Sequence, residues 1–217
     1  MKTWRIGLIR VVTMSDRSLM ELHGRLIMDS FPELQVESRC IPNQPKGIYS
    51  PETKELAVPK ILELAEEFQN VDALVVSCAD DPGVPELRQL LSIPVIGAGS
   101  SVAIVARQYG RRAGILGITD YVPTPYINVF GNNLINLGAP EGVYSTWELM
   151  THQGEKSVKR LALSLKAQGV DSIALSCTGM SSIGAAEKLR MLTGLPVVDP
   201  VFAEGLCALS QCLYRTA

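Results

Sequence analysis

Two cysteines, Cys78 and Cys177, each follow a serine at the end of a hydrophobic segment. A thiol has a pKa of about 8.5, which falls near helix amino termini, so it can exist as thiol or thiolate near neutral pH. Two such groups on opposite faces of one carbon can exchange the roles of base and acid. This pair of residues therefore indicates inversion of a carbon that bears an acidic C–H bond.

The two cysteines occupy equivalent positions of an internal repeat. The segment VDALVVSC ends at Cys78, and the segment VDSIALSC ends at Cys177. Each copy follows an amphipathic helical pattern and precedes a loop, a short helix and a Pro-Val pair, which is Pro94-Val95 or Pro196-Val197. A single cysteine at the end of a buried strand is usually a core residue. The matching positions instead favour a shared function for this pair.

The residues after each cysteine could supply hydrogen bonds to the enolate oxygen that such an inversion creates. They are Ala79, Asp80 and Asp81 after Cys78, and Thr178 and Gly179 after Cys177. Asp81-Pro82 predicts a helix cap and first turn, and Ser181 and Ser182 are candidate caps in the second copy. Free amides at helix starts bind anionic oxygen. The same residues could also be caps alone, and the two roles are compatible.

The elements that must position these residues alternate between strands and helices. Helical spacing of apolar residues recurs over 56–68 and 158–165. Alternation of this kind predicts an α/β fold with mostly parallel sheets, whose ligands bind beyond the carboxyl ends of the strands. The expected strands are Trp4–Thr13, Leu34–Cys40, Ala73–Cys78, Pro94–Gly97, Ala113–Ile118, Val143–Trp147, Ser172–Cys177 and Pro196–Val198.

Composition excludes several classes of protein. The 217 residues carry a formal net charge of −2, which gives no general attraction to nucleic acid or to anionic membranes. No apolar run is long enough to span a bilayer, and Arg5 and Arg10 interrupt the apolar amino terminus, so we expect a buried strand there and not a signal peptide. Five widely spaced cysteines indicate free thiols in a reducing cytoplasm. We expect a homo-oligomer that acts on a small molecule.

Several other residues are candidates for the site, and each of them also has a purely structural interpretation. Thr119 follows a predicted strand, so it either enters the site or belongs to a plain turn. Arg10 either extends from a sheet edge or pairs with a substrate carboxylate. The glycine-rich segment 97–101 could hold phosphate, although a tight turn from strand to helix explains it more simply. His23 and His152 lack a Cys or carboxylate at ligand spacing, so we expect no metal.

Both cysteine segments resemble the hydantoin racemase branch of the aspartate/glutamate racemase superfamily. The segments are Cys78-Ala-Asp-Asp-Pro-Gly83 and Cys177-Thr-Gly-Met180, and the resemblance covers roughly residues 45 to 205. It implies two pseudo-symmetric α/β halves, residues 1–98 plus 206–217 and residues 99–205, with the active site in the cleft between them. It also implies two cysteines that act as acid and base without a cofactor.

The chain departs from the family in ways that bear on the substrate. Hydantoin racemases usually carry Asn-Pro-Asn-Thr after the first strand, but residues 10–13 here are Arg-Val-Val-Thr, so only Thr13 matches. The residues after both cysteines also differ from those of amino-acid racemases. We therefore expect a racemase of a 5-substituted hydantoin or related ring amide. The alternatives are an amino-acid racemase, an isomerase or decarboxylase of a small dicarboxylate, which a substrate-binding Arg10 would favour, and a non-catalytic metabolite-binding protein.

Overall fold

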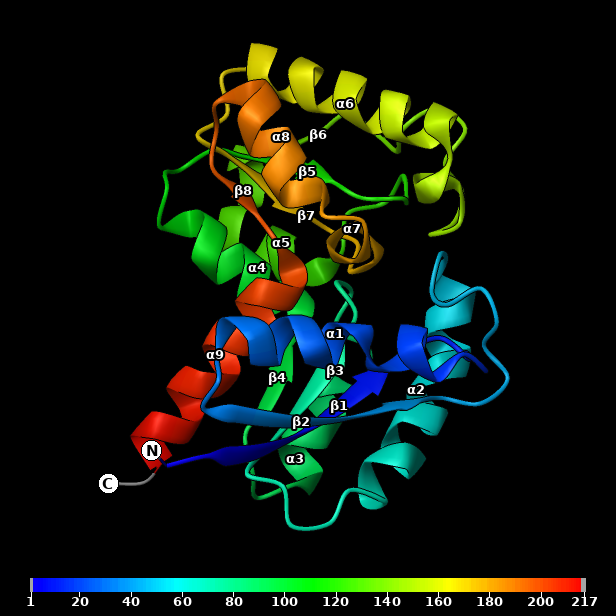
Figure 1. Cartoon of the computed structure of the whole chain (residues 1–217). Coiled ribbons are helices and arrows are strands. Elements are labelled where there is room, and N and C mark those ends of the chain that lie inside the picture. Colours follow the sequence, from blue (N-terminus) through cyan, green and yellow to red (C-terminus); the bar gives the residue numbers. More distant parts are fainter. Residues whose placement is uncertain (1, 216–217) are drawn as a thin grey trace. The chain divides into compact units, whose positions relative to one another are not determined.

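The structure is a computed structural model that describes residues 2–215 (Figure 1). The chain divides into two compact units. The first unit comprises the residues through Ala98 together with those from Val201 onward, and the second comprises Gly99–Pro200. Each unit is an α/β structure built on one parallel sheet of four strands, as the alternating sequence pattern predicted.

The sheet of the first unit has the strand order β2-β1-β3-β4. Both central strands are almost fully buried, which explains their nearly continuous apolar sequence, because helices cover both faces of a parallel sheet. The strands are β1 (Trp4–Arg10), β2 (Leu34–Cys40), β3 (Ala73–Ser77) and β4 (Val95–Gly97), and the helices are α1 (Arg17–Ser30), α2 (Pro51–Glu66), α3 (Val84–Leu90) and α9 (Pro200–Arg215).

Alternate residues of this sheet face two separate cores. Ile6, Leu8 and Val75 pack with residues of α1 and α9 on one face. Ile9 and Val76 pack with residues of α2 and α3 on the other face. Because side chains alternate along a strand, Ser77 at the end of β3 lies on the α1 and α9 face, which is the same face as Val75.

The sheet of the second unit has the order β6-β5-β7-β8, and its core lies under α6 and α8. Buried Tyr126 donates a hydrogen bond from its hydroxyl to the carbonyl of Leu175 at 2.9 Å, which attaches α5 to the end of β7. The strands are β5 (Ala113–Leu116), β6 (Leu134–Asn136), β7 (Ser172–Leu175) and β8 (Val197–Val198), and the helices are α4 (Ala98–Arg107), α5 (Thr124–Phe130), α6 (His152–Ala167), α7 (Gly179–Ser182) and α8 (Ala185–Thr193), with 3₁₀ turns η1 (Gly131–Asn133) and η2 (Glu148–Met150).

The internal repeat is a repeat of topology. In each unit the spatial order of the strands is second, first, third and fourth along the chain. The Ser-Cys pairs follow the third strand in both units, since Cys78 comes directly after β3 and Cys177 comes shortly after β7. Both thiols therefore lie at the carboxyl edge of their own sheet.

One predicted strand is wrong. Residues 143–147 form a loop, and the strand beside β5 at the edge of the second sheet is β6, with Ala113 opposite Leu134. Val143 is buried in the core of the second unit, so its apolar character reflects packing and not strand formation. β6 is short and only partly buried, so it lacks the apolar run by which a strand is recognised.

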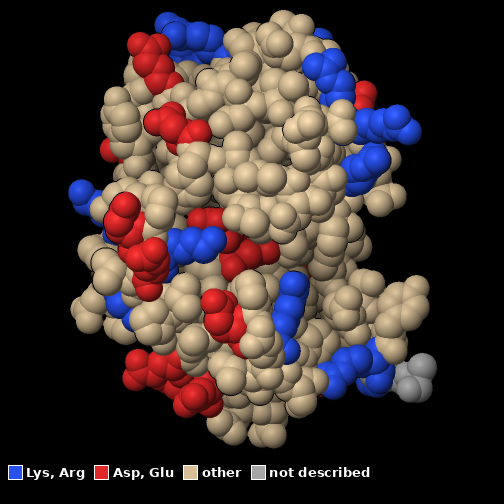
Figure 2. All heavy atoms as spheres, turned by 180° about the vertical axis from the view of Figure 1, so that it is seen from behind, with Lys and Arg blue, Asp and Glu red and all other residues tan. Residues whose placement is uncertain are grey.

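On the face drawn in Figure 2, acidic side chains lie mostly on the left and lysines and arginines mostly toward the right, with both signs side by side in the lower half. Within residues 2–215, no helix combines the length and apolar composition that crossing a bilayer requires.

Candidate active site

Cys78 begins a tight loop at the carboxyl end of β3 and is half-buried. Its amide donates to the carbonyl of Val76 at 2.9 Å, and its own carbonyl accepts from the amide of Asp81 at 3.1 Å. Ala79 is buried with 3% of its surface exposed. These contacts give the predicted residues 78–81 one compact turn.

Asp80 is held by Lys54, a residue that sequence reasoning did not select. The Lys54 ammonium donates to Oδ1 of Asp80 at 2.8 Å and to the Asp80 carbonyl at 2.9 Å. Lys54 lies in the first turn of α2, which begins with a capping box between Ser50 and Thr53. The helix start therefore fixes the lysine that holds the loop after Cys78.

Asp81 has a left-handed backbone conformation, with φ of 48°. Its carboxylate packs so closely on Gly97 that a β-carbon at Gly97 would lie 2.3 Å from the Asp81 Cγ. The predicted cap at Asp81 is wrong, because α3 starts at Val84 after Gly83, which has φ of 70° and provides no side-chain cap. Asp81 instead shapes the turn between Cys78 and the helix.

Cys177 is buried, with 7% of its surface exposed. Burial raises the pKa of its thiol to about 11, while hydrogen bonds from the amides of Gly179 and Met180 oppose that rise. The sulfur is therefore a protonated thiol near neutral pH. The two amides are placed to stabilise the thiolate after the thiol has given up its proton.

Thr178 and Gly179 start the short helix α7. A β-carbon on Gly179 would lie 2.6 Å from Cγ2 of Thr146 and 3.4 Å from the Cys177 sulfur, so the glycine permits close packing beside the thiol. The predicted caps at Ser181 and Ser182 are wrong, because both residues lie inside α7 and the cap position of α8 is Gly184. Ser181 instead donates a hydrogen bond to Asp199 at 2.8 Å.

The two predicted threonines each stabilise a loop. Thr13 donates from its hydroxyl to the carbonyl of Ile41 at 2.8 Å and accepts from the amide of Gln44 at 2.7 Å. Thr119 donates to the carbonyl of Tyr121 at 3.0 Å, in the segment that follows β5. Substrate binding by either residue stays a prediction, and both lie near the carboxyl edge of their own sheet.

Arg10 ends the central strand β1 and is 5% exposed. Its guanidinium donates to the carbonyls of Leu19 at 2.9 Å and Met20 at 3.3 Å. Burial lowers the pKa of Arg10, and the nearby Cys40 and Glu204 oppose that change. The contacts in the structure tie Arg10 to α1, and contact with a substrate carboxylate stays a prediction.

Sequence reasoning also missed three buried polar residues beside Arg10. They are His23 of α1, Ser77 of β3 and Glu204 of α9. Ser77 and Glu204 are 127 residues apart in the chain, so no local spacing connects the cluster. Only the arginine in an apolar strand gave a signal that a polar group lies inside this unit.

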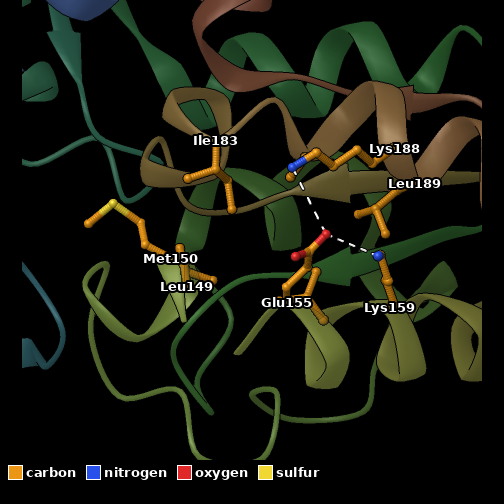
Figure 3. A pocket seen from close by; sticks show the side chains of 9 residues that line it. Leu149, Met150, Glu155, Lys159, Ile183, Lys188 and Leu189 are labelled. Atoms are coloured by element: carbon orange, nitrogen blue, oxygen red, sulfur yellow. Dashed lines mark ion pairs between the residues drawn. The ribbon is translucent and has the colours of Figure 1, made fainter. Parts of the chain in front are cut away.

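A pocket of about 160 Å³ lies elsewhere in the second unit, between α6, α8 and η2 (Figure 3). Its apolar wall includes Leu149 and Leu189. Glu155 on its rim pairs with Lys159 at 3.0 Å and with Lys188 at 4.0 Å. Among the residues that the structure describes, no three His, Cys, Asp or Glu side chains gather as a metal site would require.

Most of the chain matches one known protein family. A sequence model of the Asp/Glu/Hydantoin racemase family matches residues 12–204. A hydantoin racemase of Rhizobium meliloti is 29% identical in an alignment of 174 positions that covers 73% of this chain and 68% of that protein. A hydantoin racemase of Paenarthrobacter aurescens is 27% identical in an alignment of 158 positions that covers 70% of this chain and 65% of that protein. The matches therefore span about two thirds of these relatives.

The fold is also that of a solved allantoin racemase from Pseudomonas fluorescens. The two structures superpose with a TM-score of 0.83 over 98% of this chain and 91% of the other, at 21% sequence identity. At that identity the likeness establishes the fold.

Proposed function

Because the chain belongs to the Asp/Glu/hydantoin racemase family, we propose that it is a cofactor-independent racemase in which Cys78 and Cys177 act on opposite faces of one acidic carbon. The family places the chain among the isomerases. The proposed substrate is a 5-substituted hydantoin or a related ring amide. One observation carries the proposal: both thiols follow the third strand of sheets that share one strand order.

The environment of Cys177 supports a division of roles in the resting enzyme. With its pKa raised to about 11, the Cys177 thiol keeps its proton near neutral pH and is ready to act as the acid. Cys78 then takes the substrate proton as a thiolate. When Cys177 gives its proton to the opposite face, the amides of Gly179 and Met180 stabilise the sulfur anion that remains. The reverse reaction exchanges the two roles.

Ring amides suit this chemistry. In a 5-substituted hydantoin the carbon that bears the substituent lies between a carbonyl and a nitrogen, and loss of its proton gives an enolate. The amide of Thr178, just before α7, and that of Asp80, in the loop after Cys78, are the donors proposed for that oxygen. Two of the curated relatives described above are named hydantoin racemases, which supports this substrate class.

The test combines optical rotation with solvent deuterium exchange. Hydantoins, amino acids and small dicarboxylates are screened after gel filtration into a chelating buffer. This step removes carried-over metals and cofactors, so any remaining activity belongs to the protein alone. Cys78→Ser and Cys177→Ser should each lower racemisation by about 10²- to 10⁴-fold, since each removes one acid/base group. Each variant should keep deuterium exchange with a single enantiomer, because the remaining thiol still acts on its own face.

Cys40→Ser is the matched control, since Cys40 is a half-buried thiol at the end of β2 without a counterpart in the repeat. Racemisation at the wild-type rate by either Cys78→Ser or Cys177→Ser would refute the two-thiol mechanism. Exclusive activity on amino acids or dicarboxylates would refute the proposed substrate class and leave the mechanism standing.

A further inference from the structure

A cluster of buried polar residues lies in the first unit, on the face of the sheet covered by α1 and α9. We call it the Ser77 cluster, and its members are Arg10, His23, Ser77 and Glu204. Their exposed fractions are 5%, 0%, 2% and 0%. The proposed acid/base mechanism uses none of them, yet Ser77 directly precedes Cys78.

The cluster joins two helices to the end of β3. Nδ1 of His23 lies 2.8 Å from the Ser77 hydroxyl oxygen, and that hydroxyl donates to Oε1 of Glu204 at 2.8 Å. Arg10 is the register partner of Ser77 on the neighbouring strand β1. The negative charge of Glu204 stabilises the Arg10 guanidinium, which itself is bonded to α1.

The order of the groups differs from that of a hydrolase triad. Such a triad places histidine between the carboxylate and a serine that is open to substrate. Here the serine hydroxyl lies between histidine and the carboxylate, and it is buried. Because Ser77 donates to Glu204, His23 must donate from Nδ1 to Ser77. Burial and Arg10 lower the pKa of His23 well below 6.5, so the ring stays neutral.

Burying a polar cluster at the end of a strand costs free energy of folding. Burial of a carboxylate and a guanidinium is unfavourable, and apolar residues of similar volume often give equal or greater stability. The polar groups instead provide a defined orientation, because directional hydrogen bonds restrict the rotation of the peptide at Ser77 more narrowly than apolar packing does. On the other side of Cys78, the Lys54–Asp80 pair fixes the following loop.

We propose that Ser77 is a positioning residue for Cys78. Hydrogen bonds to His23 and Glu204 hold the carboxyl end of β3, and this fixes the direction in which the Cys78 sulfur leaves the chain. The Ser77 cluster acts only through Cys78 and touches no reacting atom. The inference rests on the proposed function to the extent that Cys78 is one of the two acid/base groups.

The experiment measures the alkylation rate of Cys78 by iodoacetamide, resolved from the other thiols by peptide mass spectrometry. The variants are Ser77→Ala, which removes both hydrogen bonds, and Glu204→Met, which keeps a side chain of similar length and removes the acceptor of the Ser77 hydroxyl. In both variants, iodoacetamide should alkylate Cys78 at least about fivefold faster than in the wild type, because the freed loop exposes the sulfur. About fivefold is the population ratio that corresponds to the net free energy of one hydrogen bond. Ser77→Thr keeps the hydroxyl and should restore the wild-type rate.

Ser176→Ala is the matched control, because Ser176 precedes Cys177 at the equivalent position of the repeat and lies in the other unit. It should leave the Cys78 rate unchanged. If a racemised compound is found, Ser77→Ala should also lower kcat by about tenfold or more with little change in KM, as displacement of a catalytic group does. Unchanged Cys78 alkylation in both variants, each with a native circular dichroism spectrum, would overturn the inference even where racemisation is confirmed.

Discussion

The ion pair between Lys54 and Asp80 allows a quantitative prediction. Asp80 is 7% exposed in its side chain and Lys54 is 30% exposed, with 2.8 Å between ammonium and carboxylate. Exposed pairs contribute about 0 to 1 kcal/mol, and breaking a fully buried pair costs about 3 to 5 kcal/mol. Since one partner is buried and the other partly hydrated, we expect Lys54→Met to lower the free energy of unfolding by about 2 kcal/mol.

Chemical denaturation and thermal melting measure this loss directly. About 2 kcal/mol corresponds to about 4 to 8 °C in Tm for a chain of this size. The matched control is Lys60→Met on the same helix, because Lys60 donates to the carbonyl of Asn43 and the amide oxygen of Gln44 and has no ionic partner among residues 2–215. That variant should lose less stability than Lys54→Met.

A double-mutant cycle isolates the pair itself. Asp80→Asn combined with Lys54→Met should be less destabilised than the sum of the two single variants, with a coupling of about 1 kcal/mol or more. On a racemised substrate, both single variants should also reduce kcat, because the loop after Cys78 loses its attachment to α2. A coupling energy below about 0.5 kcal/mol would show that the pair contributes no more than independent groups do, and the reasoning from burial would be wrong.

Two further predictions concern pH. Because burial raises the pKa of Cys177 to about 11, its alkylation rate, followed by peptide mass spectrometry, should still be rising between pH 8.5 and 10; a plateau in that range would contradict the raised pKa. His23 has a lowered pKa in the folded chain, where Arg10, Ser77 and Glu204 surround it. Its contribution to stability is therefore complete above about pH 6.5, which is the pKa of histidine in the unfolded chain, and is lost as the pH falls below that value. Relative to His23→Gln, the wild-type free energy of unfolding should therefore fall by up to about 1.4 kcal/mol per pH unit between pH 6.5 and 5, and parallel curves would refute this.

The parts of the fold that the sequence revealed are those with a periodic signal. The segments that end at Cys78 and Cys177 are buried on both faces and read as apolar runs, and both proved to be third strands of their sheets. β6 has no such run, and its place is decided by pairing with β5, which is a non-local interaction. Residues 143–147 resembled a strand because Val143 is a core residue within a loop.

The candidate site also has parts that the sequence predicts and parts that it does not. The order of residues after each cysteine was visible, but the partners that hold them were not. Lys54 reaches Asp80 from α2, 26 residues earlier in the chain, and Glu204 reaches Ser77 from the last helix, so no spacing rule connects either pair. Positive φ at Asp81 and the close approach to Gly97 also follow from packing, so the predicted cap could not be corrected from the sequence.

The path of the chain has a consequence for synthesis on the ribosome. The second unit is one uninterrupted stretch, Gly99–Pro200, whereas the first unit needs α9, which emerges after all of it. Until then Val201, Ala208 and Cys212 are missing from the core on the α1 side, and Ile6, Leu8 and Val75 lack part of their cover. The nascent first unit therefore exposes an apolar face of its sheet, and the hydrogen bond from Ser77 to Glu204 cannot yet form. The second unit can already complete its core at that stage. Vectorial synthesis thus makes the Cys78 side of the protein the last to mature and the one that most needs protection from aggregation.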